Sequence, residues 1–329
     1  MTRPFRAPFW LRAAHAQTIG GKLFRSTPEL ALRRERLELP DGDFVDLDFG
    51  PGEADWPLVV ALHGLEGSAT RRYMLQLYAA LQRRGIAAVG VNFRSCSGEP
   101  NRSARFYHSG ETEDLRAVLA HLRSRFPRRR LGAAGFSLGG NVLLKYLGET
   151  QDAAEIAAAV AVSVPYDLAA GAGMLERWPM GRFYSWYFIR MLRPKVTRMR
   201  ELVAPLCDLQ AVLRARTLRE FDEAFTAPLH GFADAADYYA RSSSAPYIER
   251  IRVKTLLIHA EDDPFLPPSF LPRAAASANP HVETAFTANG GHVGFIGGTP
   301  WRPVYWAEET AAEFLAAELR VRQPSPVTV

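Results

Sequence analysis

In Leu131-Gly132-Ala133-Ala134-Gly135-Phe136-Ser137-Leu138-Gly139-Gly140, a short apolar run ends in the pattern Gly-Phe-Ser-Leu-Gly. Apolar residues at helical spacing follow at positions 142, 143, 146 and 147. The pattern predicts a strand, a sharp turn with Ser137 at its apex, and a helix, which is the context of a nucleophile elbow. The residues two before and two after the serine crowd each other in such a turn, and Gly135 and Gly139 are small enough to fit. The alternative is a chance Gly-x-Ser-x-Gly in a glycine-rich loop.

Apolar strands and amphipathic helices alternate on both sides of this turn. Strands are predicted at 57–62, 86–91, 156–164, 253–258 and 282–287, and helices at 74–81, 115–122 and 306–319. Two alternating segments, 36–39 and 44–49, flank turn residues at 40–43 and predict an antiparallel hairpin. This alternation indicates an α/β fold, with a mostly parallel sheet and helices on both of its faces.

The alternation is interrupted between residues 166 and 247, where the sequence is helical in pattern, rich in aromatic residues and without a convincing strand. We therefore expect a helical cap inserted at 166–247 into a core formed by 31–165 and 248–322. Residues 1–30 are expected to form an ordered N-terminal extension on this core, although they show no clear period. The tail after Arg322 is expected to be frayed.

Length and composition exclude several classes of protein. The 329 residues are 47% hydrophobic and 23% charged, which argues against disorder. The net charge of +5 is too small to indicate nucleic-acid binding, and the dense arginines at 123–130 fall at a predicted helix C-terminus. No apolar core precedes Ala14-His15-Ala16, so we expect no secretory signal, and no stretch approaches the length of a membrane-spanning helix. The two cysteines, Cys96 and Cys207, form neither a disulfide framework nor a metal-ligand spacing, so we expect a cytoplasmic protein without metal or cofactor.

A serine hydroxyl needs a base to take its proton, and in an open α/β sheet such partners lie at the carboxyl ends of strands. Asp262 and Asp263 follow the strand at 253–258, and Asp263 begins a proline-containing turn that should point it back over the sheet. We predict Asp263 as the triad acid, with Asp262 as the alternative. Glycines flank His292 after the strand at 282–287, and we predict His292 as the base. The order serine, aspartate, histidine is that of α/β-hydrolases.

Two backbone N–H groups are predicted to form the oxyanion hole. One belongs to Leu138, directly after the nucleophile, at the start of a helix whose positive dipole end favours negative charge. The other belongs to Leu65, in the loop after the first parallel strand. Cys96 is a weaker candidate nucleophile, because it lies in a polar loop with no elbow pattern.

Four motifs carry a family resemblance. They are His63-Gly64-Leu65-Glu66-Gly67-Ser68, Asn92-Phe93-Arg94-Ser95-Cys96-Ser97-Gly98-Glu99-Pro100-Asn101, Tyr107-His108-Ser109-Gly110-Glu111 and Gly135-Phe136-Ser137-Leu138-Gly139-Gly140-Asn141. Together they resemble the YheT-like branch of the α/β-hydrolases, whose relatives include eukaryotic ABHD-type lipases and yeast medium-chain alcohol acyltransferases. The resemblance also covers 8–11 and 15–18, and so nearly the whole chain. It implies an α/β-hydrolase fold, the triad Ser137, Asp263 and His292, and esterase-like chemistry. Ser95 departs from the family pattern, in which we expect glycine.

The sequence thus predicts a serine carboxylic-ester hydrolase, esterase- or lipase-like, that forms an acyl-enzyme with short- to medium-chain acyl esters. The alternatives are an alcohol O-acyltransferase that uses the same acyl-enzyme, and a non-catalytic binding protein on this fold. The expected partner is a small-molecule ester and not nucleic acid. Contact with a membrane surface is expected to be transient at most, through the aromatic residues at 183–192 and the nearby Arg182, Arg190 and Arg193.

Overall fold

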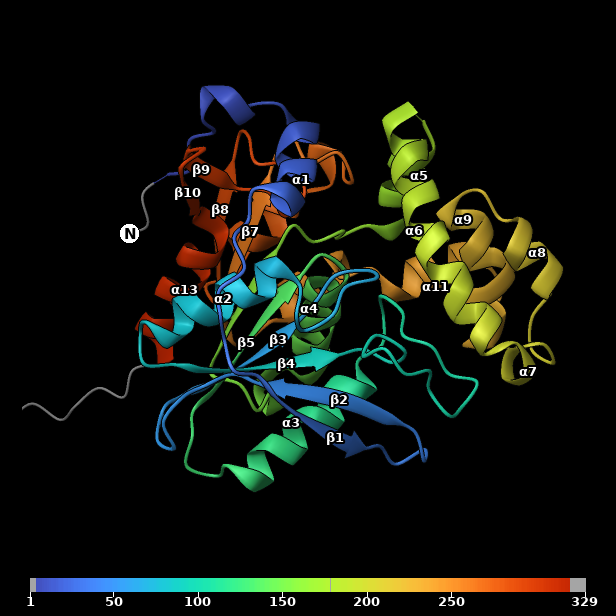
Figure 1. The fold of residues 1–329 in the computed structure, drawn as a ribbon, viewed down its shortest axis with the longest axis horizontal. Helices are drawn as coiled ribbons and strands as arrows, with labels where there is room; N and C mark the ends of the chain where they lie inside the picture. Colours follow the sequence, from blue (N-terminus) through green and yellow to red (C-terminus); the bar gives the residue numbers. More distant parts are fainter. Residues whose placement is uncertain (1–3, 178, 320–329) are drawn as a thin grey trace, which may run out of the picture.

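An eight-stranded sheet forms the centre of the computed structural model, which describes residues 4–177 and 179–319 (Figure 1). Its strands are β1 (Arg33–Glu38), β2 (Phe44–Phe49), β3 (Leu58–Leu62), β4 (Ala87–Asn92), β5 (Leu131–Phe136), β6 (Ala158–Val162), β7 (Lys254–Ala260) and β8 (Val282–Thr287). Their order is β1-β2-β4-β3-β5-β6-β7-β8. The strands from β4 to β8 in this order are parallel, whereas β2 pairs antiparallel with β1 and with β4. The predicted hairpin and mostly parallel sheet are therefore confirmed.

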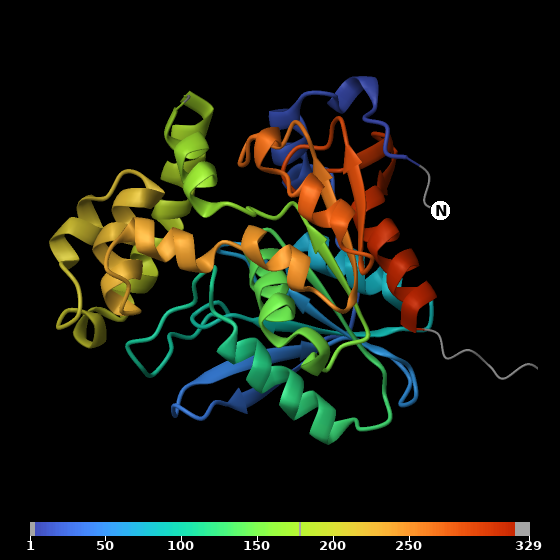
Figure 2. The same cartoon turned by 180° about the vertical axis from the view of Figure 1, so that it is seen from behind.

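Helices cover both faces of the sheet, as predicted. They are α2 (Arg72–Gln82), α3 (Glu113–Arg125), α4 (Leu138–Thr150) and α13 (Trp306–Leu319). Because successive strand residues point to opposite faces, Leu131 and Ala133 of β5 pack into the core with α3 and α4, whereas Ala134 and Phe136 pack with α2 and α13. Figures 1 and 2, which look from opposite sides, show these two layers. The strand β5 is buried along its whole length, so the serine turn at its end is fixed from both faces.

Between β6 and β7 the chain leaves the sheet and forms a group of helices on one side of it (Figure 1). These are α5 (Leu168–Arg177), α6 (Pro179–Arg198), α7 (Arg200–Val203), α8 (Leu209–Arg214), α9 (Leu218–Phe221), the π-helix η3 (Asp222–Thr226), α10 (Ala227–Leu229), α11 (Ala235–Ser242) and the 3-10 helix η4 (Ala245–Arg250). We call residues 166–247 the helical segment. Trp178, part of its predicted aromatic cluster, lies outside the described residues. On α6 the side chains of Phe183 and Trp186 are exposed.

None of the helices within the described ranges is both long and apolar enough to cross a membrane. The longest, α6, carries basic side chains along its length, among them Arg190 and Lys195.

The N-terminal residues form a helix that the sequence did not predict. The 3-10 turn η1 (Phe9–Leu11) leads into α1 (Ala14–Leu23), which lies beside β9 (Ile296–Thr299), the first strand of a small hairpin with β10 (Arg302–Tyr305). Polar contacts hold α1 in place. The side-chain nitrogen of Gln17 donates to the carbonyls of Leu11 and Ile296, and its oxygen accepts from the Ile296 N–H. A helix that is held in this way shows no strong hydrophobic period.

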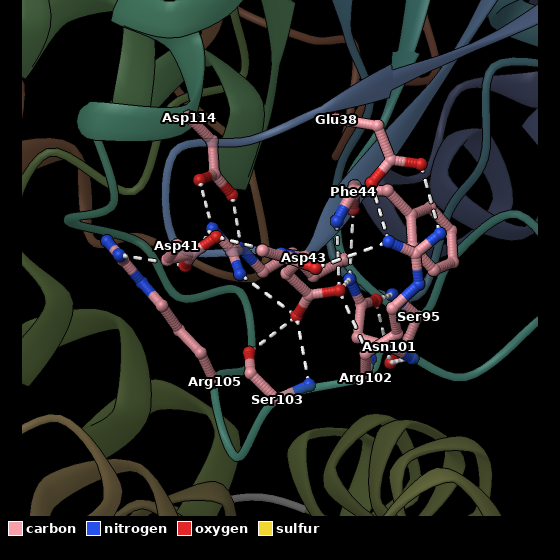
Figure 3. A network of polar contacts seen from close by, with 12 residues as sticks. Glu38, Asp41, Asp43, Phe44, Ser95, Asn101, Arg102, Ser103, Arg105 and Asp114 are labelled. Carbon is pink, nitrogen blue, oxygen red and sulfur yellow. Dashed lines mark hydrogen bonds and ion pairs between the residues drawn. The ribbon is translucent and has the colours of Figure 1, made fainter.

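The loop between β4 and α3 is fixed by a network of ion pairs and hydrogen bonds (Figure 3). The fully buried Arg94 binds Asp114 through two nitrogens, at 2.8 and 2.7 Å, and Asp43 through a third, at 3.0 Å. Asp43 also accepts a hydrogen bond of 2.7 Å from Asn101. Ser95 has a φ of 60°, in the left-handed region that favours glycine, which explains the family pattern at this position. Its hydroxyl donates to Asn101 at 3.1 Å, so this serine is held in the network.

The remaining short elements are η2 (Gln151–Ala153), η5 (Pro268–Phe270) and α12 (Arg273–Ala278).

Candidate active site

Ser137 stands in the turn between β5 and α4 with φ of 51° and ψ of −119°, a strained combination for a residue with a side chain. The turn is tight on both sides of the serine. A Cβ atom on Gly135 would lie 2.5 Å from the carbonyl oxygen of Gly139. A Cβ atom on Gly139 would lie 2.6 Å from the carbonyl oxygens of Leu62 and His63. These contacts explain why this turn needs glycine at both positions.

His292 reaches Ser137 from the loop that follows β8. Its Nε2 lies 2.9 Å from Ser137 Oγ. The backbone just before it is left-handed at Gly291, where φ is 58°, and the His292 N–H donates to Thr18 Oγ1 of α1 at 2.9 Å. Ser163, after β6, accepts a hydrogen bond of 3.0 Å from the N–H that follows the histidine. The N-terminal helix and the sheet therefore hold the histidine loop together.

Two neighbouring carboxylates after β7 contact the histidine loop in different ways. The buried Asp263 places its two oxygens 2.8 and 3.2 Å from His292 Nδ1. Asp262 instead accepts hydrogen bonds from the backbone N–H of Gly291 at 2.8 Å and from the side chain of Asn289 at 3.2 Å. The structure thus brings Asp263 to the imidazole and Asp262 to the loop that carries it.

Burial and charge act on Asp263 in opposite directions. Burial alone would raise the pKa of this carboxyl, but the charge of His292 and the hydrogen bond to its ring outweigh burial, and the pKa lies below its ordinary value. His259 lies behind the carboxylate, with its Nε2 3.4 Å from Asp263 Oδ2, and burial lowers the pKa of His259 to about 4. At neutral pH, Asp263 is therefore ionised beside an uncharged His259, and His292 is the group that its charge can stabilise.

Both N–H groups predicted for the oxyanion hole lie beside Ser137. Leu138 begins α4, and Leu65 follows Gly64, on which a Cβ atom would lie 3.1 Å from Ser137 Cβ. In the part of the chain that the structure describes, neither the Leu65 nor the Leu138 N–H donates a hydrogen bond to a protein acceptor. Both groups can therefore bind a substrate oxygen, as an oxyanion hole requires.

A buried ion pair joins the loop after β3 (residues 63–68, the β3 loop) to the helical segment. Glu66 has a φ of 53°; its carboxylate accepts from the Tyr107 hydroxyl at 2.7 Å, and its N–H donates to the same hydroxyl at 2.9 Å. Lys195 of α6 places its Nζ 2.8 Å from the Glu66 carboxylate and 3.1 Å from Cys96 Sγ. Burial raises the pKa of Cys96 to about 11, although Lys195 acts in the opposite direction. The thiol is therefore protonated at neutral pH and a poor nucleophile.

Two cavities meet at Ser137, and Leu65, Phe188, Phe265 and His292 line both of them. The first has a volume of about 120 Å³, and we call it the apolar cavity. Its other lining residues include Phe106, Leu138, Leu168, Leu192, Leu218 and Phe221. The second has a volume of about 500 Å³, and we call it the arginine cavity. Its other lining residues include Arg25, Glu66, Arg71, Arg72, Tyr73 and Tyr184. Ser137 thus lies between two cavities, one on each side.

Sequence reasoning did not find several residues that support the site. The ring of Phe265 stacks on that of His292, with centroids 4.1 Å apart. Thr18 and Tyr107 support the histidine loop and the β3 loop, and both lie in motifs of the family resemblance, which was a usable signal. No pattern in the sequence relates Lys195 to the β3 loop, because 129 positions separate it from its glutamate partner.

Comparison with known proteins finds similarity over most of the chain. Residues 57–299 match the family described as alpha/beta hydrolase fold. "Putative esterase YheT" of Escherichia coli is 42% identical over 316 residues, which cover 94% of this chain and 92% of that protein. "Phospholipase ABHD3" of Mus musculus is 30% identical over 325 residues, which cover 96% of this chain and 79% of the mouse protein. Among solved structures, an esterase of Pyrococcus furiosus is 18% identical, has a TM-score of 0.58, and covers 97% of this chain and 98% of its own.

Proposed function

This chain belongs to the α/β-hydrolase family, in its YheT-like branch, and we propose that it is a serine carboxylic-ester hydrolase that acts through Ser137, His292 and Asp263. The names of its relatives support the coarser statement, an esterase- or lipase-like hydrolase. The observation that carries the finer proposal is the continuous path from Ser137 Oγ through the imidazole to Asp263, with distances of 2.9 and 2.8 Å.

In the proposed mechanism, His292 Nε2 takes the proton from Ser137 Oγ while the oxygen attacks the ester carbonyl. Asp263 orients the imidazole through Nδ1 and stabilises the imidazolium that forms. The N–H groups of Leu65 and Leu138 stabilise the oxyanion of the tetrahedral intermediate. His292 then gives the proton to the leaving alcohol, and an acyl-enzyme remains on Ser137.

Water completes the reaction by the same steps. His292 takes a proton from the water molecule, the resulting hydroxide attacks the acyl carbonyl, and the carboxylic acid leaves as Ser137 recovers its proton. An alcohol that entered in place of water would produce a new ester, and the chain would then act as an alcohol O-acyltransferase.

We also propose that the helical segment, 166–247, is a cap inserted between two parts of the core, 31–165 and 248–322, with residues 1–30 as an extension. Positions 320–322 lie outside the described residues. The wall that the helical segment contributes to the apolar cavity, including Leu168, Leu192 and Phe221, supports binding of a hydrocarbon chain. The small volume of this cavity favours short- to medium-chain acyl groups over long ones.

The test is hydrolysis of p-nitrophenyl esters of increasing acyl length by the wild-type protein and by Ser137→Ala. We expect a rate that depends on Ser137 and an optimum at short or medium chain length. Undiminished hydrolysis by Ser137→Ala would overturn the assignment of the nucleophile. Formation of an octyl ester when octanol is added would identify the acyltransferase, and saturable binding without turnover of any ester would identify a binding protein.

A further inference from the structure

The arginine cavity carries charged groups that the proposed mechanism does not use. Arg25, Glu66, Arg71 and Arg72 line this cavity. Two of them are compensated within the protein, since the buried Arg25 pairs with Glu308 at 2.6 Å and Glu66 pairs with the lysine of α6. Arg71 is exposed immediately before α2, and within residues 4–177 and 179–319 it forms no ion pair with a carboxylate. The cavity therefore presents a positive charge to whatever occupies it.

The β3 loop holds Arg71 in the cavity that Ser137 also lines. Arg71 Nη2 donates to the backbone carbonyl of Glu66 at 2.6 Å, one residue after the Leu65 N–H assigned to the oxyanion hole. A carbonyl fixes the position of the guanidinium without neutralising its charge, and other N–H donors of the group remain for a ligand. Arg72 adds a second guanidinium, which donates to the carbonyl of Arg25 at 3.1 Å. A planar guanidinium matches the oxygens of a phosphate or a carboxylate.

The two cavities differ in positive charge. Arg25, Arg71 and Arg72 line the arginine cavity, whereas no arginine or lysine among the described residues lines the apolar cavity. The apolar cavity suits a hydrocarbon acyl chain, because Leu138, Leu192 and Phe221 contribute to its wall. The arginine cavity is larger, and its wall also has apolar parts, such as Phe183 and Met191, around the guanidinium groups. With the carbonyl at the nucleophile and the acyl chain in the apolar cavity, the alcohol half extends into the arginine cavity.

We propose that the arginine cavity binds the alcohol half of an ester that carries a phosphate or carboxylate group, with Arg71 as the main ligand and Arg72 beside it. This inference rests on the proposed function, because it takes Ser137 as the group that attacks the ester. It adds selection of the leaving alcohol by charge. The anionic group belongs either to a free soluble ester or to the head group of a lipid.

The experiment compares three esters that share the acyl group preferred in the nitrophenyl series and differ in the alcohol: glycerol, glycerol 3-phosphate and glyceric acid. Release of the free acid measures kcat and KM. We expect the wild-type protein to prefer an anionic ester over the glycerol ester. Arg71→Gln should lower kcat/KM for the anionic ester by about tenfold, mainly through KM, as expected for the loss of a charge-assisted hydrogen bond. Hydrolysis of the neutral glycerol ester should fall much less, because that ester offers no anion to the guanidinium.

A matched control separates this site from the overall charge of the protein. The double variant of the cavity, Arg71→Gln with Arg72→Gln, removes two positive charges. The control variant, Arg83→Gln with Arg241→Gln, also removes two, but from exposed side chains that pair with Glu309 and Asp237. The control should retain the preference for the anionic ester, and the double variant of the cavity should lose it. The neutral ester also controls for disturbance of the β3 loop, which would slow all esters equally.

The outcomes distinguish this inference from the function on which it rests. The anion site would be overturned if Arg71→Gln slowed neutral and anionic esters equally, or if the control variant lost the preference for the anionic ester as the double variant of the cavity does. In either case, hydrolysis that depends on Ser137 would still support the proposed function. Hydrolysis that survives Ser137→Ala would overturn the proposed function itself. Phosphatidylglycerol vesicles form the lipid arm. If Arg71→Gln reduces turnover of the vesicles and the control variant does not, the site is supported and the anion belongs to a lipid head group. The same pattern with the soluble esters alone would assign the anion to a free ester.

Discussion

The Nζ of Lys195 on α6 lies 2.8 Å from the carboxylate of Glu66, one residue after Leu65, whose N–H we propose for the oxyanion hole. Both side chains of this pair are largely shielded from solvent, with 18% and 3% of their area exposed. The same helix lines the apolar cavity through Phe188 and Leu192. A displacement of α6 would therefore act on the β3 loop as well as on the cavity, and we expect it to couple substrate binding to the geometry of the proposed oxyanion hole.

Lys195→Met should disturb both stability and catalysis, because it leaves the carboxylate of Glu66 buried without its cation. We expect the free energy of unfolding to fall by roughly 3 kcal/mol, as for other broken buried pairs. We expect kcat to fall by about tenfold with little change in KM, since a displaced oxyanion donor acts on the transition state. Urea unfolding and steady-state kinetics measure these effects.

The control for this prediction is the double variant Lys195→Met, Glu66→Gln, in which the buried charge is also removed. Most of the lost stability should return. Loss of stability in Lys195→Met with an unaltered kcat would show that the ion pair has no part in positioning the β3 loop.

Asp263→Asn and Asp262→Asn should have very different effects, because only Asp263 contacts the imidazole of His292. The amide cannot stabilise an imidazolium, and the corresponding change in a serine protease lowers kcat by about 10⁴-fold. Asp262→Asn weakens only a hydrogen bond to the histidine loop, and should lower kcat by less than about tenfold. Kinetics with one nitrophenyl ester compares the two variants. A larger loss in Asp262→Asn would exchange their roles.

Three glycine-to-alanine changes should separate the geometry of the nucleophile from the stability of the helices. Gly139→Ala places its Cβ 2.6 Å from two backbone oxygens, and should destabilise the protein by about 1–3 kcal/mol or more. Gly64→Ala has a milder contact of 3.1 Å with Ser137 Cβ, so kcat should fall while folding is retained. Gly173 of α5 has no atom within 4 Å of an added Cβ. Gly173→Ala should therefore stabilise the helix by up to about 1 kcal/mol.

Thermal unfolding and ester hydrolysis of the three variants measure these effects. Equal destabilisation in all three would mean that the close contacts around the serine turn do not determine the outcome.

Acid should destabilise the protein below pH 6.5, because buried histidines are uncharged in the folded state. Burial lowers the pKa of His63 to about 3, and those of His230 and His259 to about 4, from 6.5. Each binds a proton when the chain unfolds, so the stability that is present above pH 6.5 is lost as the pH falls toward 4. Asp222 acts in the opposite sense, since burial raises its pKa to about 6 from 3.8. Burial also raises the pKa of Glu111 and Glu308, but it lowers the pKa of a fourth histidine, His108, well below 6.5, and we expect the histidines to dominate.

Urea unfolding across this pH interval measures the effect. His230→Phe is a suitable comparison, because it keeps an aromatic ring against His108, whose centroid lies 4.4 Å from that of His230, and removes one titrating group. The slope of stability against pH should become shallower by about 1.4 kcal/mol per pH unit where this group titrates. A stability that does not change over the interval would contradict the account of the buried histidines.

Sequence patterns predicted the sheet well because its strands are buried apolar runs with turn residues between them. Placement of Asp263 and His292 near Ser137 followed from parallel strands, whose carboxyl ends meet at one edge. The helix α1 was not predictable in the same way, because it depends on hydrogen bonds of Gln17 and not on an apolar period. The contact of Lys195 with the β3 loop depends on how the helical segment sits on the core, which no local pattern specifies.

The central claim is that Ser137 is a nucleophile activated by His292, and covalent labelling with a fluorophosphonate tests it most directly. The reagent transfers its phosphonyl group to an activated serine oxygen and releases fluoride. Mass spectrometry should find the added group on the peptide that contains Ser137, no added group in Ser137→Ala, and labelling slowed by about 10³-fold or more in His292→Ala. Labelling of another residue, or labelling of Ser137 that does not depend on His292, would contradict the account.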